Sequence, residues 1–83
     1  MRTNRHHRRP RSQKGSGAPR NISRVSVLKH IAWHDLFGNM TAEEIVEEIN
    51  RVWLDPDFFM VLVPKDAPTY EACKSFMKMM ERK

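Results

Sequence analysis

Residues 26–53 read SVLKHIAWHDLFGNMTAEEIVEEINRVW and contain the two clearest helix patterns in the chain. Apolar residues recur at helical spacing from Leu28 to Phe37, and Ser26 before them is a natural N-cap. Gly38 comes directly after the last apolar position, where a residue that tolerates positive φ commonly ends a helix. The pattern predicts a helix that begins after Ser26 and ends before Gly38.

A second helix is predicted to begin after Thr41. The Thr41 hydroxyl can accept a hydrogen bond from the amide of Glu44 while the Glu44 side chain reaches back to Thr41, as in a capping box. Apolar residues then recur from Ile45 to Trp53, and glutamates occupy the opposite face. The sequence therefore predicts an amphipathic helix with an acidic, solvated side.

Residues 54–64 fit either a helix or a strand. Asp55 followed by Pro56 resembles the start of a short buried helix. The six consecutive apolar residues at 58–63 equally suit a buried strand, which would need a partner such as residues 23–28. We favour the helix.

A final helix is predicted to start at Pro68–Thr69. Its apolar residues share one face: Tyr70, Cys73, Phe76, Met77 and Met80. Arg82 and Lys83 in its last turn would complement the helix dipole. We expect Trp53, Phe76 and Met80 to lie in the core of a small helical bundle.

The first twenty residues differ sharply in composition from the rest. They contain seven Lys or Arg residues and no Asp or Glu, whereas residues 21–83 contain eight basic and ten acidic residues, so the two parts carry +7 and −2. A segment with so few apolar side chains and so much like charge buries too little surface to offset its ordering entropy. We predict a disordered basic arm and linker over residues 1–20 and a small folded domain over residues 21–83.

The predicted fold class is mostly α, with a domain of three to four helices behind the disordered basic arm. The alternative is an α+β fold with a two-stranded ribbon, which would form if residues 54–64 contained a strand. A chain of 83 residues allows one domain at most, and that domain would be marginally stable.

Composition also narrows the functional classes. The single cysteine, Cys73, excludes an internal disulfide and fits a reducing compartment, so we expect an intracellular, cytoplasmic protein. The longest apolar run is far too short to span a bilayer, so no membrane partner is predicted. No nucleophile signature is present and the core is too small for a substrate pocket, so we predict no enzyme, no small-molecule substrate and no cofactor.

His30 and His34 are four residues apart on the first predicted helix, which is the spacing of two metal ligands on one face. Further ligands would have to come from Cys73, His6, His7 or a carboxylate, and no local spacing indicates any of them. We therefore interpret His30 and His34 as polar-face or boundary residues and predict no metal site.

The basic arm is the strongest functional signal. Its cations can neutralise phosphates and release counterions, which gives a sequence-independent affinity for DNA or RNA. The residues predicted to bind nucleic acid are Arg2, Arg5, Arg8, Arg9, Arg11, Lys14 and Arg20. A solubilising tail, or one that docks an acidic protein, is the alternative interpretation.

Residues 24–50 resemble small prokaryotic helix-turn-helix modules of the antitoxin and regulator type. The similarity lies in Arg24-Val25-Ser26-Val27, the helix to Phe37 and the turn Gly38-Asn39-Met40-Thr41-Ala42-Glu43-Glu44-Ile45. The resemblance implies a trihelical DNA-binding unit. The helix after the turn carries four glutamates, which phosphate would repel, so it would be a supporting helix and residues 54–64 would be the reading helix.

Two functions follow from these patterns. The first is a non-enzymatic nucleic-acid-associated protein, a small transcriptional regulator whose arm contacts phosphates. The second is a small adaptor or inhibitor, such as a phage-type host-takeover or ribosome-associated factor, whose acidic helical body binds a large protein machine or forms a homodimer. The residues predicted to contact protein are Phe58, Phe59, Met79, Glu43 and Glu47.

Overall fold

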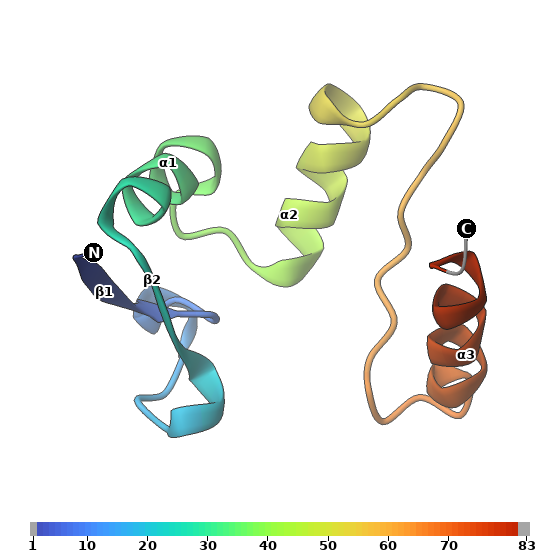
Figure 1. The fold of residues 1–83 in the computed structure, drawn as a ribbon, viewed down its shortest axis with the longest axis horizontal. Coiled ribbons are helices and arrows are strands. Elements are labelled where there is room, and N and C mark those ends of the chain that lie inside the picture. Colours follow the sequence, from blue (N-terminus) through green and yellow to red (C-terminus); the bar gives the residue numbers. More distant parts are fainter. Residues whose placement is uncertain (1, 82–83) are drawn as a thin grey trace.

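The computed structural model describes residues 2–81. Its strands and α-helices are β1 (Thr3–His7), β2 (Ile22–Ser26), α1 (Val27–Phe37), α2 (Ala42–Glu48) and α3 (Tyr70–Met80) (Figure 1). Short 3₁₀ turns at Arg11–Gln13 and Pro19–Asn21 lie between the strands, and a π-helical stretch, Ile49–Trp53, continues α2. The strands and α1 lie at one end of the molecule and α3 lies at the other.

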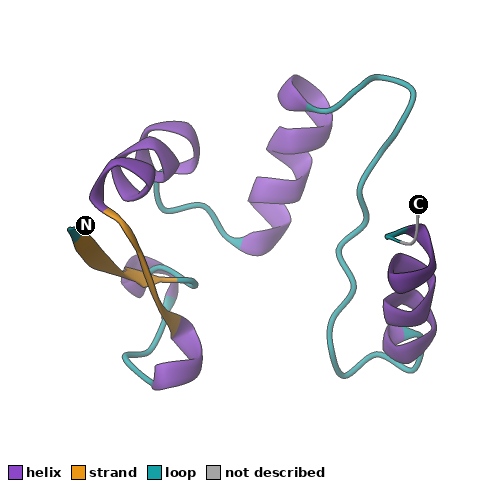
Figure 2. Cartoon of the chain, viewed as in Figure 1, coloured by secondary structure: helices purple, strands orange, loops and turns teal. Residues whose placement is uncertain are grey.

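The fold is α+β, so the predicted mostly-α class with a disordered basic arm is wrong. β1 and β2 form an antiparallel two-stranded sheet (Figure 2). The register pairs Arg5 with Arg24. The partner of β2 therefore comes from the arm and not from residues 54–64. Backbone pairing with β2 and packing on α1, where the His6 ring contacts that of Trp33, together order this polar segment.

A network of hydrogen bonds closes the loop between the two strands. The Asn21 side chain accepts a hydrogen bond from the Arg9 amide at 2.7 Å and donates to the carbonyl oxygens of Arg9 at 3.1 Å and Ser16 at 2.7 Å. Gly15 lies so close to the preceding chain that a Cβ there would sit 1.8 Å from the Arg9 carbonyl oxygen. These contacts hold residues that the sequence pattern assigns to a linker.

Both predicted ends of α1 are confirmed. The Ser26 side-chain oxygen accepts a hydrogen bond from the Lys29 amide at 3.1 Å, and Gly38 follows the helix with a φ of 54°. Phe37 is the one buried apolar residue of the described chain, and its ring packs 4.6 Å from that of Trp33, centroid to centroid. The small core therefore lies at the end of α1.

The predicted capping box of α2 is also confirmed. The Thr41 amide donates to the Glu44 carboxylate at 3.0 Å, and the Glu44 amide donates back to the Thr41 hydroxyl at 3.3 Å. The helix then continues through the π-helical stretch to Trp53. Its last turn closes where the Leu54 amide donates to the Ile49 carbonyl at 2.8 Å.

Residues 54–64 form neither the predicted helix nor the alternative strand. A single turn closes where the Phe58 amide donates to the Asp55 carbonyl at 3.0 Å, and the chain then runs on without regular structure. At Met60 the Asn50 side chain replaces a regular backbone partner: it donates to the Met60 carbonyl at 2.9 Å and accepts from the Met60 amide at 2.7 Å. One side chain thus takes both backbone groups of Met60, which a helix or a strand partner would otherwise have used.

The helix α3 forms where it is predicted, but it lies apart from the other helices and does not pack against them (Figure 1). Trp53, Phe76 and Met80 are 57%, 61% and 56% exposed, so their predicted place in a bundle core is wrong. The Cα radius of gyration is 14.8 Å, against about 12 Å for a compact chain of this length. The open shape leaves too few contacts between helices to bury these side chains.

The expected contribution of Arg82 and Lys83 to the dipole of α3 lies outside the described residues. No helix in the described part of the chain combines the length and apolar character needed to cross a lipid bilayer.

Candidate functional site on the strand ribbon

The structure gathers the predicted basic residues into one unit, residues 2–26, which we call the basic module. It consists of β1, the loop and β2. All seven predicted residues are exposed within it: Arg2, Arg5, Arg8, Arg9, Arg11, Lys14 and Arg20. Within residues 2–81 none of them forms an ion pair with an acidic side chain; the ion pair found there joins Arg51 to Glu48. The positive charge of the module is therefore not neutralised internally.

Arg24 belongs to the same site and was missing from the predicted set. The strand register places it directly opposite Arg5, so both guanidinium groups project from one face of the ribbon. Arg24 Nη1 also donates to Thr3 Oγ1 across the strands at 3.2 Å. The alternation of Arg24 with Val25 already indicated an outward position, but the partner strand that brings Arg5 beside it could not be read from local spacing.

Two further arginines are positioned by backbone carbonyl groups. Arg9 Nε donates to the Gln13 carbonyl at 2.8 Å, and Arg8 Nη1 donates to the Arg20 carbonyl at 3.3 Å. Such bonds orient a guanidinium group without cancelling its charge. Because each guanidinium has five N–H donors, most of them remain available to an anion.

Three histidines meet where the other face of the ribbon packs on α1. One ring nitrogen each of His6, His30 and His34 lies within 4.8 Å of the others. The Nε2 atoms of His30 and His34 are 3.0 Å apart, and the Asn4 side-chain amide lies 3.2 Å from His30 Nδ1. The strand pairing brings His6 to the helix from 24 residues away. Sequence reasoning named His6 as a conceivable third ligand but had no spacing that pointed to it.

The His6 imidazole is partly buried and incompletely satisfied. Burial lowers the pKa of His6 below its ordinary value of 6.5, and the neighbouring His30 and His34 lower this pKa further. His6 Nδ1 is buried without a hydrogen-bond partner among the described residues. The Trp33 ring packs edge-on against His6, with the centroids 5.7 Å apart. The neutral form of His6 is therefore favoured.

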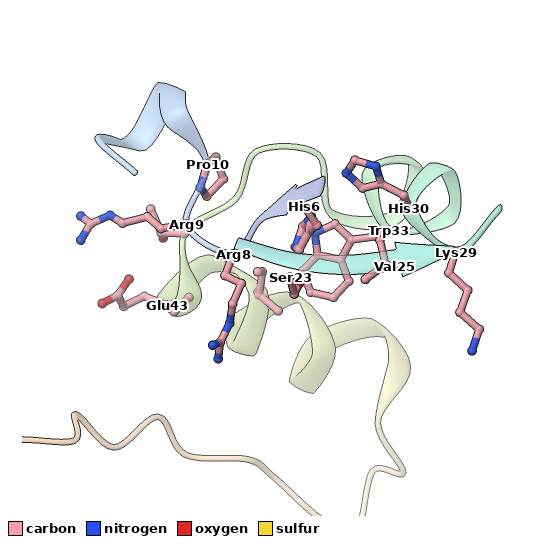
Figure 3. A pocket seen from close by; sticks show the side chains of 13 residues that line it. His6, Arg8, Arg9, Pro10, Ser23, Val25, Lys29, His30, Trp33 and Glu43 are labelled. Atoms are coloured by element: carbon pink, nitrogen blue, oxygen red, sulfur yellow. The ribbon is translucent and has the colours of Figure 1, made fainter. Parts of the chain in front are cut away.

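A pocket of about 540 Å³ lies beside the histidines, between the ribbon, α1 and the start of α2 (Figure 3). His6 and Trp33 lie side by side in its centre. Arg8 and Arg9 border it on one side and Lys29 on the other. Glu43 also lines the pocket, so its border carries three basic side chains and one acidic side chain. An apolar floor with a mainly cationic border suits a ligand that combines a flat or apolar part with negative charge.

The residues predicted to contact protein are all exposed but do not form one patch. Glu43 and Glu47 lie on α2 and line a groove of about 560 Å³ that also includes Leu62. Phe58 and Phe59 lie in the irregular segment that follows α2 and are not part of this groove. Met79 lies on α3, which is separate from α2 (Figure 1).

The region that resembles a helix-turn-helix module comprises the end of β2, α1, the turn and α2. The third helix of such a unit, expected at residues 54–64, does not form. No protein-family model, curated protein or solved structure matches the chain significantly.

Proposed function

We propose that the chain is a non-enzymatic nucleic-acid-associated protein that contacts phosphates through the basic module. The observation that carries the proposal is the pairing of Arg5 with Arg24 on one exposed face, with no ion pair to an acidic side chain among the described residues. Like charges directly opposite each other destabilise a strand pair. A phosphate between the two guanidinium groups would remove this repulsion and accept hydrogen bonds from both.

The shape of the module supports duplex DNA as the target. A two-stranded ribbon fits the major groove of B-DNA, whereas the major groove of an RNA helix is too deep and narrow for side chains to read. The ribbon face that carries Thr3, Arg5 and Arg24 is exposed, because the face with Asn4 and His6 packs on α1. A role in transcription regulation, as the resemblance of residues 24–50 implies, belongs to the same proposal.

The proposal is tested by the salt dependence of duplex binding. The full chain and the double variant Arg5→Gln/Arg24→Gln are titrated against a labelled DNA duplex at several salt concentrations. Each lost phosphate contact lowers the magnitude of the slope of log K against log salt by about 0.9, so the double variant, which loses the phosphate that the two arginines share, should lose about 0.9. The same titration with an RNA duplex should give weaker binding.

The matched control is Lys65→Gln/Lys78→Gln, which removes the same charge from exposed positions outside the basic module. It should leave the slope nearly unchanged. The proposal is wrong if the wild-type slope is close to zero, or if the control variant lowers it as much as the arginine variant does.

A second candidate function is binding of a protein partner by the acidic body. Phe58 and Phe59 are 67% and 77% exposed, and the radius of gyration is larger than that of a compact chain of this length. Large exposed aromatic side chains are typical of interface anchors. A second copy of the chain is the simplest partner, and a larger protein machine would be bound by the same surface.

Sedimentation of the full chain over a range of concentrations tests this second candidate. A dimer that reverts to the monomer mass in Phe58→Ser/Phe59→Ser supports it. The control is Phe76→Ser, which replaces another exposed aromatic residue, on α3. A wild-type mass of 9.8 kDa at every concentration argues against the homodimer.

A further inference from the structure

We propose that His6, His30 and His34 form a binding site for a divalent transition-metal ion of the Zn²⁺ class, which fastens β1 to α1. Neutral imidazole nitrogens are preferred ligands of Zn²⁺, Cu²⁺ and Ni²⁺. The site goes beyond nucleic-acid binding and does not depend on it. Its three ligands come from two elements, a strand and a helix, that are distant in sequence.

The distances in the cluster are close to those of a coordination site. Zn–N bonds of about 2.0–2.1 Å in a tetrahedral site place the nitrogens about 3.4 Å apart. His30 and His34, one turn apart on α1, already present their Nε2 atoms at 3.0 Å. All three ligand atoms lie within 4.8 Å of one another, so no pair of nitrogens has to close by more than about 1.4 Å.

Without an ion, the hydrogen-bonding needs of the three imidazole rings are not fully met. The two facing Nε2 atoms form a hydrogen bond only if one of them carries a proton. His6 Nδ1 is buried without a partner among the described residues, and an unmet buried polar atom costs free energy. An ion coordinated by the three rings would replace the shared proton and draw His6 into a bond.

Asn4 is placed to act as a positioning residue. Its side-chain N–H donates to His30 Nδ1 at 3.2 Å, which keeps the His30 proton on Nε2 and blocks that atom as a ligand. If Nε2 of His30 binds the metal, its Nδ1 proton needs a hydrogen-bond acceptor. Ligating histidines usually donate this second N–H to a carboxylate, a carbonyl group or water. The Asn4 amide supplies that acceptor when it turns its oxygen to the ring. An aspartate at this position would supply it without turning.

Three protein ligands leave one coordination position for water or for a donor from a bound partner. Among residues 2–81, no further histidine, cysteine or carboxylate completes the group. The ion would therefore fasten the ribbon to the helix without closing its own coordination sphere. Because both elements contribute ligands, metal binding should increase the protection of the β1 amides against hydrogen exchange.

The test is a Zn²⁺ titration of the full chain. Calorimetry measures the binding, and NMR spectra record the ring signals of the four histidines. One ion should bind per chain, and the signals of His6, His30 and His34 should shift while that of His7 stays. His30→Gln should weaken binding by at least about 100-fold, and the control His7→Gln should not. Circular dichroism without metal shows whether each variant is folded.

A second pair of variants separates a metal site from a purely structural histidine cluster. Asn4→Asp should tighten Zn²⁺ binding by about 10-fold, whereas Thr3→Asp, which adds the same charge on the opposite ribbon face, should not. The proposal fails if wild type binds no Zn²⁺, if His7→Gln is as harmful as His30→Gln, or if all four histidine signals shift alike. The NMR titration of wild type decides the matter even if His30→Gln does not fold.

Discussion

Arg5 lies directly opposite Arg24 across the β1–β2 ribbon, and no acidic side chain forms an ion pair with either residue in the described part of the chain. A pair of like charges in this position weakens the sheet that carries it. The molecule therefore keeps two guanidinium groups together at a cost in stability, which is expected where the pair serves to bind an anion.

Replacing Arg5 by threonine should separate stability from binding. Arg5→Thr removes the repulsion and adds a β-branched residue, so the ribbon should gain about 0.2–1 kcal/mol while duplex affinity falls. Hydrogen exchange of the β1 amides measures the first effect and duplex titration measures the second. If the variant loses both ribbon protection and affinity, the weaker binding reflects unfolding, and Arg5 is not shown to contact phosphate.

Gly15→Ala should destabilise the loop of the basic module. The added Cβ would lie 1.8 Å from the Arg9 carbonyl oxygen, a backbone atom that cannot move aside cheaply. We expect a loss of about 2 kcal/mol in the free energy of unfolding, measured by urea denaturation. Gly17→Ala is the control, because nothing lies within 4 Å of a Cβ there, and it should be neutral or slightly stabilising. Equal effects of the two substitutions would show that the loop is not packed as described.

The capping box of α2 gives a prediction on helix stability and its pH dependence. Thr41→Ala should cost about 1 kcal/mol, because the N-cap hydroxyl bond is lost. The backbone and side-chain bonds from Thr41 lower the pKa of Glu44 below 4.5, so its contribution is full above pH 4.5 and is lost as pH falls through the lowered pKa. Far-ultraviolet circular dichroism during an acid titration should show this loss in wild type. Glu43→Gln should retain it and Glu44→Gln should not.

His6 should make the ribbon less stable in mild acid. Its pKa is lowered from 6.5, first by burial and then by the neighbouring His30 and His34, so the unfolded chain takes up a proton more readily than the folded chain. Its stabilising contribution is therefore full above pH 6.5 and declines as pH falls through the lowered pKa. Unfolding free energies of wild type and His6→Gln, measured with a chelator present from about pH 8 to about pH 5, test this. Parallel pH profiles for the two chains would contradict it.

The helices could be predicted because their signals are local. Ser26, Gly38, Thr41 and Glu44 act on backbone groups within one turn, so their residue types alone mark where α1 and α2 begin and end. The predicted start of α3 has the same basis. None of these predictions required knowledge of which elements lie together.

The ribbon and the histidine cluster could not be predicted in this way. β1 looks like a disordered segment by composition, and only its hydrogen bonds to β2 and its contacts with α1 order it. The position of His6 beside His30 follows from that pairing and from no spacing in the sequence. The prediction for residues 54–64 was wrong for the opposite reason. A strong local pattern indicated regular structure, but the Asn50 side chain forms hydrogen bonds with both backbone groups of Met60.

The most direct test is an NMR titration of the full chain with a DNA duplex, read at each backbone amide. Contact through the basic module predicts the largest shifts at Thr3, Arg5 and Arg24 and in the loop between the strands, with little change in α3. Shifts concentrated in α2 or α3, or no shifts at low salt, would contradict it.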